Sequence, residues 1–598
     1  MRMIHPRLFI SVATALLLIS SQSVAQYSPN CPFQGAVFPA PRNPRNSSLV
    51  ISSALSSLKD KLKEIVAEPT LFDNATTSFQ LNLFSKDEQL LSLSHAATTL
   101  DNTSLPSGAL GENTIFRIGS VSKLLTVYAL LAEIGMDHMQ DPVTAWVPEL
   151  ANKANYKVQD AVRRVNWEDV TIGALASHQA GLDRDYSLSD LANLINATVA
   201  EQAALPPLPP DEIPTCGTTN LLLPSCSRAE FLAAIRGLHP VTSAFHTPIY
   251  SNLAFQILAY ALERIAKKPF AAIFESTLVE GLGLKRTSLQ PPSSTREGIV
   301  PGDAISSWWN VSLGDASPFG GILSTGADMA SIGRSILGSK LLKPALTREW
   351  LRPVAHTADL HVAVGMPWEI HRLLQPLSPG SNHTRVVDLY TKNGILGGYE
   401  ALFVLSPEHE FGFVLLLAGL TTPAGSAARS LALAVIGDVV TGALATAFEQ
   451  AARAEAEANF GGVYANPESG MNLTISVNDG HPGLKLSNWT LSGDKDVDVL
   501  ELYTGVPNAG LDARLYPMDL GGDGGAVAFR AVYEAARGPS YTSQPGVVFS
   551  LGCLPWGSVA GIQYGNVAFD DFVFEVDWKG RATAITPRVA RQTLKRVK

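Results

Sequence analysis

Apolar and polar positions follow two different patterns along this chain. Up to about residue 447, stretches with helical spacing are mixed with shorter apolar runs that indicate strands. The chain is therefore expected to form one long mixed region at 51–447. The expected helices lie at 49–66, directly after Ser120, at 254–267 and at 328–337, and the expected strands at 79–84, 400–405 and 411–420. Because strands that suit antiparallel pairing frame the helices, the pattern predicts an α+β fold with an antiparallel sheet flanked by helices.

The second pattern consists of short alternating runs separated by Gly, Asn and Asp. Runs such as 473–477 and 572–578 predict a small C-terminal all-β domain, a sandwich or barrel, at 460–598. The Ala- and Glu-rich segment 448–459 before it is expected to be a helical linker. A chain of 598 residues is also too long for one ordinary core, which favours two or more domains.

Residues 1–25 have the pattern of a secretory signal peptide. Two arginines precede an apolar run, Leu8–Ile19, and small residues follow at Ser23–Ala25. The run is too short to cross a membrane as a helix. The protein is therefore expected to be secreted and extracellular, with an irregular Pro- and Asn-rich segment at 26–50.

The apolar run 431–448 is interrupted by Asp438 and Gly442, which favours a core helix over a membrane span. The C-terminus carries no lipid-anchor signal, so no membrane anchor is expected. The net charge of −9 argues against nucleic acid as a partner, because phosphate binding needs a basic surface.

Secretion agrees with the sequons and the cysteines. Asn-x-Ser/Thr sequons predict glycosylation at Asn46, Asn74, Asn102, Asn196, Asn310, Asn382, Asn472 and Asn488. Four cysteines suggest two disulfides with three possible pairings. Cys216 and Cys226 are close together in a Pro-rich insertion, 201–227, and are expected to pair, which leaves Cys31 with Cys553. No Cys-x-x-Cys pair or His/Cys cluster suggests a zinc site, so no metal or other cofactor is expected.

The candidate chemistry begins at Ser120, which lies three residues before Lys123 at the head of an apolar helix. Residues three apart share one helix face, so the amine can hydrogen-bond the hydroxyl. A free serine is a weak nucleophile and needs a neighbour that takes its proton. Ser-x-x-Lys is one known solution, although by itself the pattern is equally typical of a helix start with a solvated lysine.

Two later segments supply partners. Tyr250 and Asn252 precede a predicted helix, and Lys392 and Gly394 precede a predicted strand. A phenol acts as a base only when cations stabilise its charged form, and the two lysines are candidates for that role. The amides of Ser120 and Ile395 are candidates for an oxyanion hole.

A Ser-His-Asp triad is the alternative that His178 and His246 raise. Each histidine is better explained as a structural, hydrogen-bonded side chain. The Gly-x-Ser-x-Gly elbow of α/β-hydrolases is also missing around Ser120.

With Ser-x-x-Lys, Tyr-x-Asn and Lys-x-Gly in this order, residues 50–445 resemble the class C β-lactamase and D,D-peptidase superfamily. The whole chain is most similar to secreted fungal β-lactamase-like proteins, which have a similar Cys-containing insertion and a C-terminal β domain. The resemblance implies that Ser120 attacks a carbonyl and that Lys123 and Tyr250 move the proton, with Tyr250 as the general base. It also implies that Asn252 orients Lys123 or substrate, and that Lys392 holds a substrate oxygen or carboxylate and lowers the Tyr250 pKa.

The third motif departs from that family, because it reads Lys-Asn-Gly where β-lactamases usually have Lys-Thr-Gly. The expected function is therefore a secreted serine hydrolase, an esterase or amidase that forms an acyl-enzyme on Ser120 with a small-molecule or peptide substrate. An acyltransferase or cyclising enzyme of secondary metabolism and a non-catalytic binding protein are the alternatives. The hydrolase and the acyltransferase share the acyl-enzyme and differ in the group that attacks it, whereas the intact set of Ser120, Lys123 and Tyr250 argues against a binding protein.

Overall fold

The computed structural model describes residues 32–42, 44, 48–99, 105, 110–151, 161–219, 223–376, 384–477, 479–491, 501, 510–522, 525–535 and 555–597. These residues divide into two compact units. One unit comprises residues 53–373 and 388–443, and it contains every candidate catalytic residue. The other comprises residues up to 52, 374–387 and 444–598. The signal-peptide segment and both Cys31 and Cys553 lie outside the described residues.

The catalytic unit is built on an eight-stranded sheet with the order β2-β1-β10-β9-β8-β7-β6-β5. Its strands are β1 (Ser78–Ser85), β2 (Gln89–His95), β5 (Ala355–His356), β6 (Val362–Val364), β7 (Glu369–Pro376), β8 (Thr384–Leu396), β9 (Tyr399–Ser406) and β10 (Phe411–Ala418). Both β1 and β10 are buried along their whole length. The continuous apolar run of β10 suits an interior position, covered on both faces, whereas β1 also buries the polar side chains of Gln80 and Asn82.

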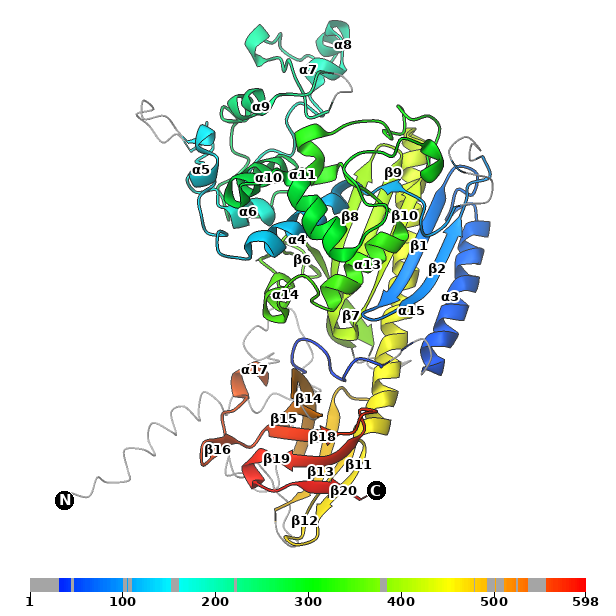
Figure 1. Cartoon of the computed structure of the whole chain (residues 1–598), viewed down its shortest axis with the longest axis vertical. Helices are drawn as coiled ribbons and strands as arrows, with labels where there is room; N and C mark the ends of the chain where they lie inside the picture. The colour runs from blue at the N-terminus through cyan, green and yellow to red at the C-terminus, as the bar shows by residue number, and fades with distance from the viewer. Residues whose placement is uncertain are drawn as a thin grey trace, which may run out of the picture. The chain divides into compact units, whose positions relative to one another are not determined.

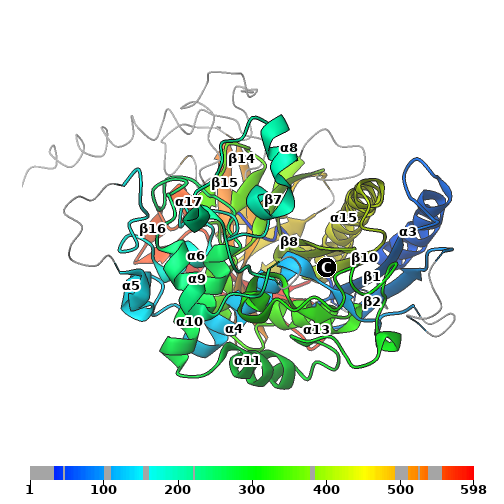
Figure 2. The same cartoon turned by 90° about the horizontal axis from the view of Figure 1, so that it is seen from above.

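Helices cover both faces of this sheet (Figures 1 and 2). The long helices α3 (Leu49–Ala67) and α15 (Pro423–Phe460) lie along one face. On the other face, α13 (Gly326–Leu337) packs on β1 and β10, while α4 (Ser122–Ile134) packs against α10 (Leu253–Ala266). The shorter helices are α5 (Val143–Trp146), α6 (Ile172–Ala176), α7 (Leu191–Leu194), α8 (Ala197–Gln202), α9 (Arg228–Ile235), α11 (Phe270–Ile273), α12 (Ser317–Gly320) and α14 (Pro344–Trp350).

The sequence of α4 is apolar on nearly every side of the helix because the helix is buried. Residues 122–131 are all buried, including Lys123. A helix that is hydrophobic all round belongs in a core rather than at a surface. The helix that carries the Ser-x-x-Lys motif is therefore the central helix of this unit.

The second unit contains a closed barrel with the strand order β11-β12-β13-β14-β15-β18-β19-β20. Its strands are β11 (Gly462–Asn466), β12 (Met471–Ser476), β13 (Leu484–Thr490), β14 (Leu511–Gly522), β15 (Ala526–Ala535), β18 (Asp571–Val576), β19 (Ala582–Pro587) and β20 (Leu594–Arg596). Inward-facing Phe529, Phe572 and Phe574 fill its core together with Phe460 from the end of α15. Closure removes the free edges that an open sheet would leave.

The predicted linker at 448–459 is not a separate helix. It is the C-terminal part of α15, which runs unbroken from Pro423 to Phe460. The helix passes through Gly442 because one glycine costs only about 1 kcal/mol in a helix interior. By length and composition alone α15 is also apolar enough to cross a membrane, and Ile436 and Val440 in its apolar stretch are fully buried within the catalytic unit.

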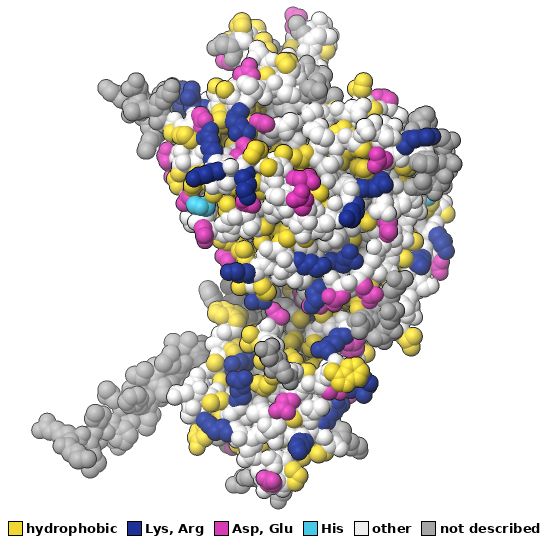
Figure 3. All heavy atoms as spheres, viewed as in Figure 1, with side chains coloured by type: hydrophobic (Ala, Val, Ile, Leu, Met, Phe, Trp, Pro, Cys, Tyr) yellow, Lys and Arg dark blue, Asp and Glu magenta, His cyan; other side chains and the backbone are white. Residues whose placement is uncertain are grey.

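Several predicted sequons are accessible. Asn74, Asn196, Asn310 and Asn488 are exposed, and Asn472 is half-buried. Asn46, Asn102 and Asn382 lie outside the described residues. Basic and acidic side chains are interspersed over the face of the molecule that Figure 3 shows.

A buried ion pair in the barrel unit gives a stability prediction. Arg385 Nη2 donates to Glu449 Oε2 at 2.7 Å, and the two side chains are only 3% and 4% exposed. Replacing Arg385 by alanine removes this buried partner of the Glu449 carboxylate, so we expect a loss of about 3–5 kcal/mol in the free energy of unfolding. Urea unfolding measures this loss. The exposed pair Lys63–Asp60 is the control, and Lys63→Ala is expected to cost about 1 kcal/mol or less.

Candidate active site

Ser120 lies in a sharp turn between the short strand β3 (Phe116–Arg117) and α4. Gly119 before it has φ +50°, a left-handed conformation that glycine adopts without strain. Arg117 anchors the strand, since its buried guanidinium donates to the carbonyls of Trp309 and Val311, both at 2.6 Å. The Ser120 hydroxyl is thus positioned by a rigid backbone on each side.

Lys123 is fully buried and makes three polar contacts through its Nζ. The amine lies 2.6 Å from Asn252 Oδ1, 2.7 Å from the Phe319 carbonyl and 3.0 Å from Ser120 Oγ. The first two partners only accept hydrogen bonds. A neutral amine has two protons for them, and its lone pair then faces the serine hydroxyl.

Burial and the nearby Lys392 ammonium hold the pKa of Lys123 well below its ordinary value, against the opposing effect of Asp185 and Glu369. Both lowering causes disfavour a charged amine. The geometry and the direction of the pKa shift therefore agree that Lys123 can accept the Ser120 proton as a neutral base.

Tyr250 completes the contacts of the nucleophile, because its hydroxyl donates to Ser120 Oγ at 2.6 Å. The turn that carries it is held by the preceding loop. Asn252 N donates to the Arg184 carbonyl at 2.7 Å, and Asn252 Nδ2 donates to Asp185 Oδ1 at 2.7 Å. Asn252 thereby links Lys123 to the Asp185 carboxylate, which orients the amine.

The lowered pKa that was expected for Tyr250 is not found. Burial raises the pKa of this phenol above its ordinary value, and the Glu369 carboxylate adds to that effect, while the hydrogen bond with Ser120 opposes it. A phenol with a raised pKa keeps its proton at neutral pH. The structure therefore favours Tyr250 as a hydrogen-bond donor and Lys123 as the base, which reverses the roles expected from the resemblance.

Two glycines bring the candidate oxyanion amides together. A methyl group built on Gly394 would lie 2.7 Å from the Ser120 amide nitrogen, and one built on Gly119 would lie 2.7 Å from the Ile395 nitrogen. Any side chain at either position would force β8 away from the start of α4. Glycine at both positions thus allows the two backbones to approach as an oxyanion hole requires.

Lys392 lies on β8, and its ammonium is fully buried. It forms an ion pair with Glu369 on β7 and donates to the Asn393 carbonyl at 3.0 Å. Its Nζ is 5.2 Å from the centroid of the Tyr250 ring. The structure thus brings all five predicted catalytic side chains together, but it pairs Lys392 with an internal carboxylate.

His178 is a structural histidine, as expected. Its ring stacks on Tyr250 with centroids 4.4 Å apart, and its Nδ1 accepts a hydrogen bond from Ser251 N at 3.2 Å. Burial and neighbouring cations hold its pKa well below the ordinary range, so the ring stays neutral. It supports the Tyr250 loop and makes no described contact with Ser120, and His246 is not part of the described network around Ser120 either.

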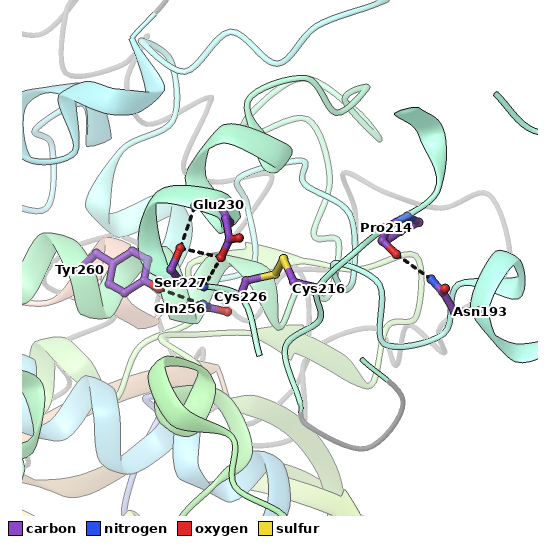
Figure 4. The surroundings of a disulfide bond; sticks show 8 residues. All are labelled: Asn193, Pro214, Cys216, Cys226, Ser227, Glu230, Gln256 and Tyr260. Carbon is purple, nitrogen blue, oxygen red and sulfur yellow. Dashed lines mark hydrogen bonds between the residues drawn. A yellow bond between two sulfur atoms is a disulfide. The ribbon is translucent and has the colours of Figure 1, made fainter. Parts of the chain in front are cut away.

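Cys216 and Cys226 form the expected disulfide (Figure 4). The segment between α7 and α9 is not a plain loop, since it contains α8 and a short 3-10 turn at Pro210–Glu212. Directly after Cys226, Ser227 and Glu230 form a capping box that starts α9. Among the described residues, no group of three or more His, Cys, Asp or Glu side chains is arranged to hold a metal ion.

Comparisons with known proteins agree with this geometry. A family profile described as Beta-lactamase matches residues 94–437, and a profile described as Beta-lactamase-like-like, C-terminal domain, matches residues 452–598. A protein named Beta-lactamase-like protein, from Arthroderma benhamiae, is 26% identical over 597 residues, which cover 94% of this chain and 95% of that protein. Probable hydrolase M10 from a Phoma species is 29% identical over 445 residues, which cover 72% of this chain and 69% of that protein.

Among solved structures, a β-lactamase/D-alanine carboxypeptidase from Yersinia pestis complexed with citrate aligns at 19% identity with a TM-score of 0.45, covering 66% of this chain and 99% of that one. The first profile spans more than half of the chain.

Proposed function

Because the chain belongs to the β-lactamase family, we propose that it is a secreted serine hydrolase that cleaves an ester or amide of a small molecule or peptide. Its fold is the β-lactamase/transpeptidase-like α+β fold, followed by a C-terminal domain of mostly strands, as the sequence predicts. One observation carries the proposal: Ser120 Oγ lies 3.0 Å from the buried Lys123 amine and 2.6 Å from the Tyr250 hydroxyl. Secretion is supported by the signal pattern at residues 1–25.

In the proposed acylation, Ser120 Oγ attacks the substrate carbonyl while its proton passes to Lys123 Nζ. The amides of Ser120 and Ile395 stabilise the oxyanion that forms. Lys123 then returns the proton to the leaving group, with Tyr250 as the relay, and the bond between the acyl carbon and the leaving group breaks. Water resolves the acyl-enzyme by the same steps in reverse.

Ester or amide substrates are favoured over β-lactams by the third motif. Asn393 replaces the usual threonine, and its side chain is turned to Glu369. With the amide oxygen and nitrogen exchanged, its nitrogen lies 3.3 Å from each carboxylate oxygen. No threonine hydroxyl is therefore available there to hold a lactam carboxylate. Two similar proteins are named as probable hydrolases, M10 from a Phoma species and clz13 from Cochliobolus lunatus, which supports the general class of reaction.

The pH dependence of activity follows from the two pKa shifts. Lys123 must be neutral to act as a base, so kcat/KM rises with pH through its lowered pKa and levels off well below the ordinary lysine value of about 10.4. Tyr250 must keep its proton, and its raised pKa means that no fall is expected before about pH 10. A profile of kcat/KM from pH 4 to 10 measures the rise and shows whether activity then stays level up to pH 10. A rise centred near pH 10 would contradict this assignment of the base.

Steady-state hydrolysis of p-nitrophenyl esters, anilides and one chromogenic cephalosporin, with the secreted protein, tests the proposal. We expect turnover of at least one ester or anilide and little turnover of the cephalosporin. If every ester and anilide resists hydrolysis while the cephalosporin is turned over, the proposed substrate class is wrong.

A further inference from the structure

The solvent-facing charge beside Lys392 is negative. Lys392 is 0% exposed in its side chain, whereas its partner Glu369 is 28% exposed. A ligand that approaches this side of the site therefore meets a carboxylate before it meets the ammonium group.

Three donors hold the Glu369 carboxylate in place. Lys392 Nζ binds Oε1, and Asn393 N donates to Oε2 at 3.1 Å. With its amide oxygen and nitrogen exchanged, the orientation that satisfies both groups, the Asn393 side chain donates to both carboxylate oxygens at 3.3 Å. An ammonium group, a backbone amide and a side-chain amide form the kind of set that would bind the carboxylate of a ligand. In this chain an internal carboxylate already occupies it.

This ion pair borders the reacting atoms. Lys392 Nζ lies 5.2 Å from the centroid of the Tyr250 ring, and Tyr250 OH lies 2.6 Å from Ser120 Oγ. Arg184 is a more exposed cation nearby. Its guanidinium carbon lies 4.9 Å from the centroid of the Tyr250 ring, and its Nε lies 3.6 Å from Asp185 Oδ2. Lys392 and Arg184 therefore both have acidic partners.

We propose that Glu369 is a specificity-determining residue that makes the site select uncharged acyl donors over donors with a carboxylate near the scissile carbonyl. The inference rests on the proposed function of Ser120. A substrate carboxylate must either displace Glu369 from Lys392 or remain beside it. Because like charges repel strongly in a partly buried site, either course weakens binding of the charged donor by roughly tenfold or more.

Reversible binding of two boronic acids tests this without requiring turnover. Phenylboronic acid is uncharged, and 4-carboxyphenylboronic acid carries the added carboxylate. In each, boron accepts an electron pair from Ser120 Oγ, the serine O–H bond breaks, and its proton passes to Lys123 Nζ, so no leaving group is needed. Titration calorimetry gives the ratio of the two dissociation constants.

We expect the wild type to bind the uncharged probe at least about tenfold more tightly, Glu369→Gln to lose most of that preference, and Glu369→Asp to keep it. Glu369→Ala serves as a second neutral variant if Glu369→Gln has a much lower melting temperature than the wild type. Glu410→Gln removes an acidic residue that is paired with Lys86 and is the control, with an unchanged ratio.

The outcomes separate the two proposals. An equal preference in wild type and Glu369→Gln overturns the role of Glu369 alone. Wild-type preference for the charged probe, lost in Arg184→Gln, also overturns it, because Arg184 would then be the anion-binding group. If Ser120→Ala binds phenylboronic acid as tightly as the wild type does, or if the wild type binds neither probe, the proposed nucleophile is wrong and the inference fails with it.

Discussion

Replacing Ser120 by alanine is expected to reduce ester turnover by roughly 10⁴-fold or more, because no covalent intermediate can form without the attacking oxygen. Stability should change little. The hydroxyl is half-buried and, among the described residues, hydrogen-bonds Lys123 and Tyr250, so its loss costs about 1 kcal/mol. Initial rates at saturating ester concentration, together with the melting temperature, measure the two quantities.

Ser122→Ala is the matched control, since this serine is two residues further along the same segment and its Oγ accepts from Ile322 N at 3.1 Å. Ser122→Ala also removes one hydroxyl group that takes part in hydrogen bonding, but this group has no role in the proposed chemistry. Wild-type turnover by Ser120→Ala would show that another group is the nucleophile.

Replacing Lys123 by methionine is expected to lower kcat by about 10²- to 10⁴-fold, the usual contribution of a general base. Methionine has a similar length and suits a fully buried site, although the Asn252 and Phe319 oxygens lose a donor. The acid limb of the pH profile should also disappear, because the group that titrates there is gone. If Lys123 only supported the fold, Lys123→Met would keep the acid limb of the pH profile.

Tyr250→Phe is the informative comparison for Lys123→Met. It removes the hydrogen bond donated to Ser120 Oγ but leaves the amine in place, so we expect a lower rate with the acid limb retained. If Tyr250→Phe abolishes the acid limb and Lys123→Met keeps it, the phenol is the base and the assignment made here is reversed.

The motif residues could be predicted from sequence because local geometry determines their relation. Ser120 lies in the 3-10 turn Gly119–Val121 that leads directly into α4, and Lys123 lies in the first turn of that helix. A spacing of three residues along such a helical segment places both side chains on one face. Apolar runs likewise predicted α4 and the interior strand β10, and an amphipathic pattern predicted α10. The extent of α15 was predicted less well, because two adjacent helical patterns of different composition, 431–448 and 448–459, do not show whether one helix continues through both.

The environment of those residues was not predictable in the same way. Glu369 meets Lys392 because β7 and β8 are neighbours in the sheet, and no local pattern marks a single acidic residue for that role. Asp185 reaches Asn252 through a loop whose path depends on tertiary packing. The direction of the Tyr250 pKa shift depends on burial, which a sequence shows only indirectly.

Intact-mass spectrometry of the protein after glycosidase treatment and brief exposure to a panel of activated esters and one cephalosporin is the decisive test for an acyl-enzyme on Ser120. We expect a mass increment equal to the acyl group on the wild type, located on Ser120 by peptide mapping and missing from Ser120→Ala. An increment of the same size on Ser120→Ala, or ester turnover that continues with every adduct located on another residue, would contradict it.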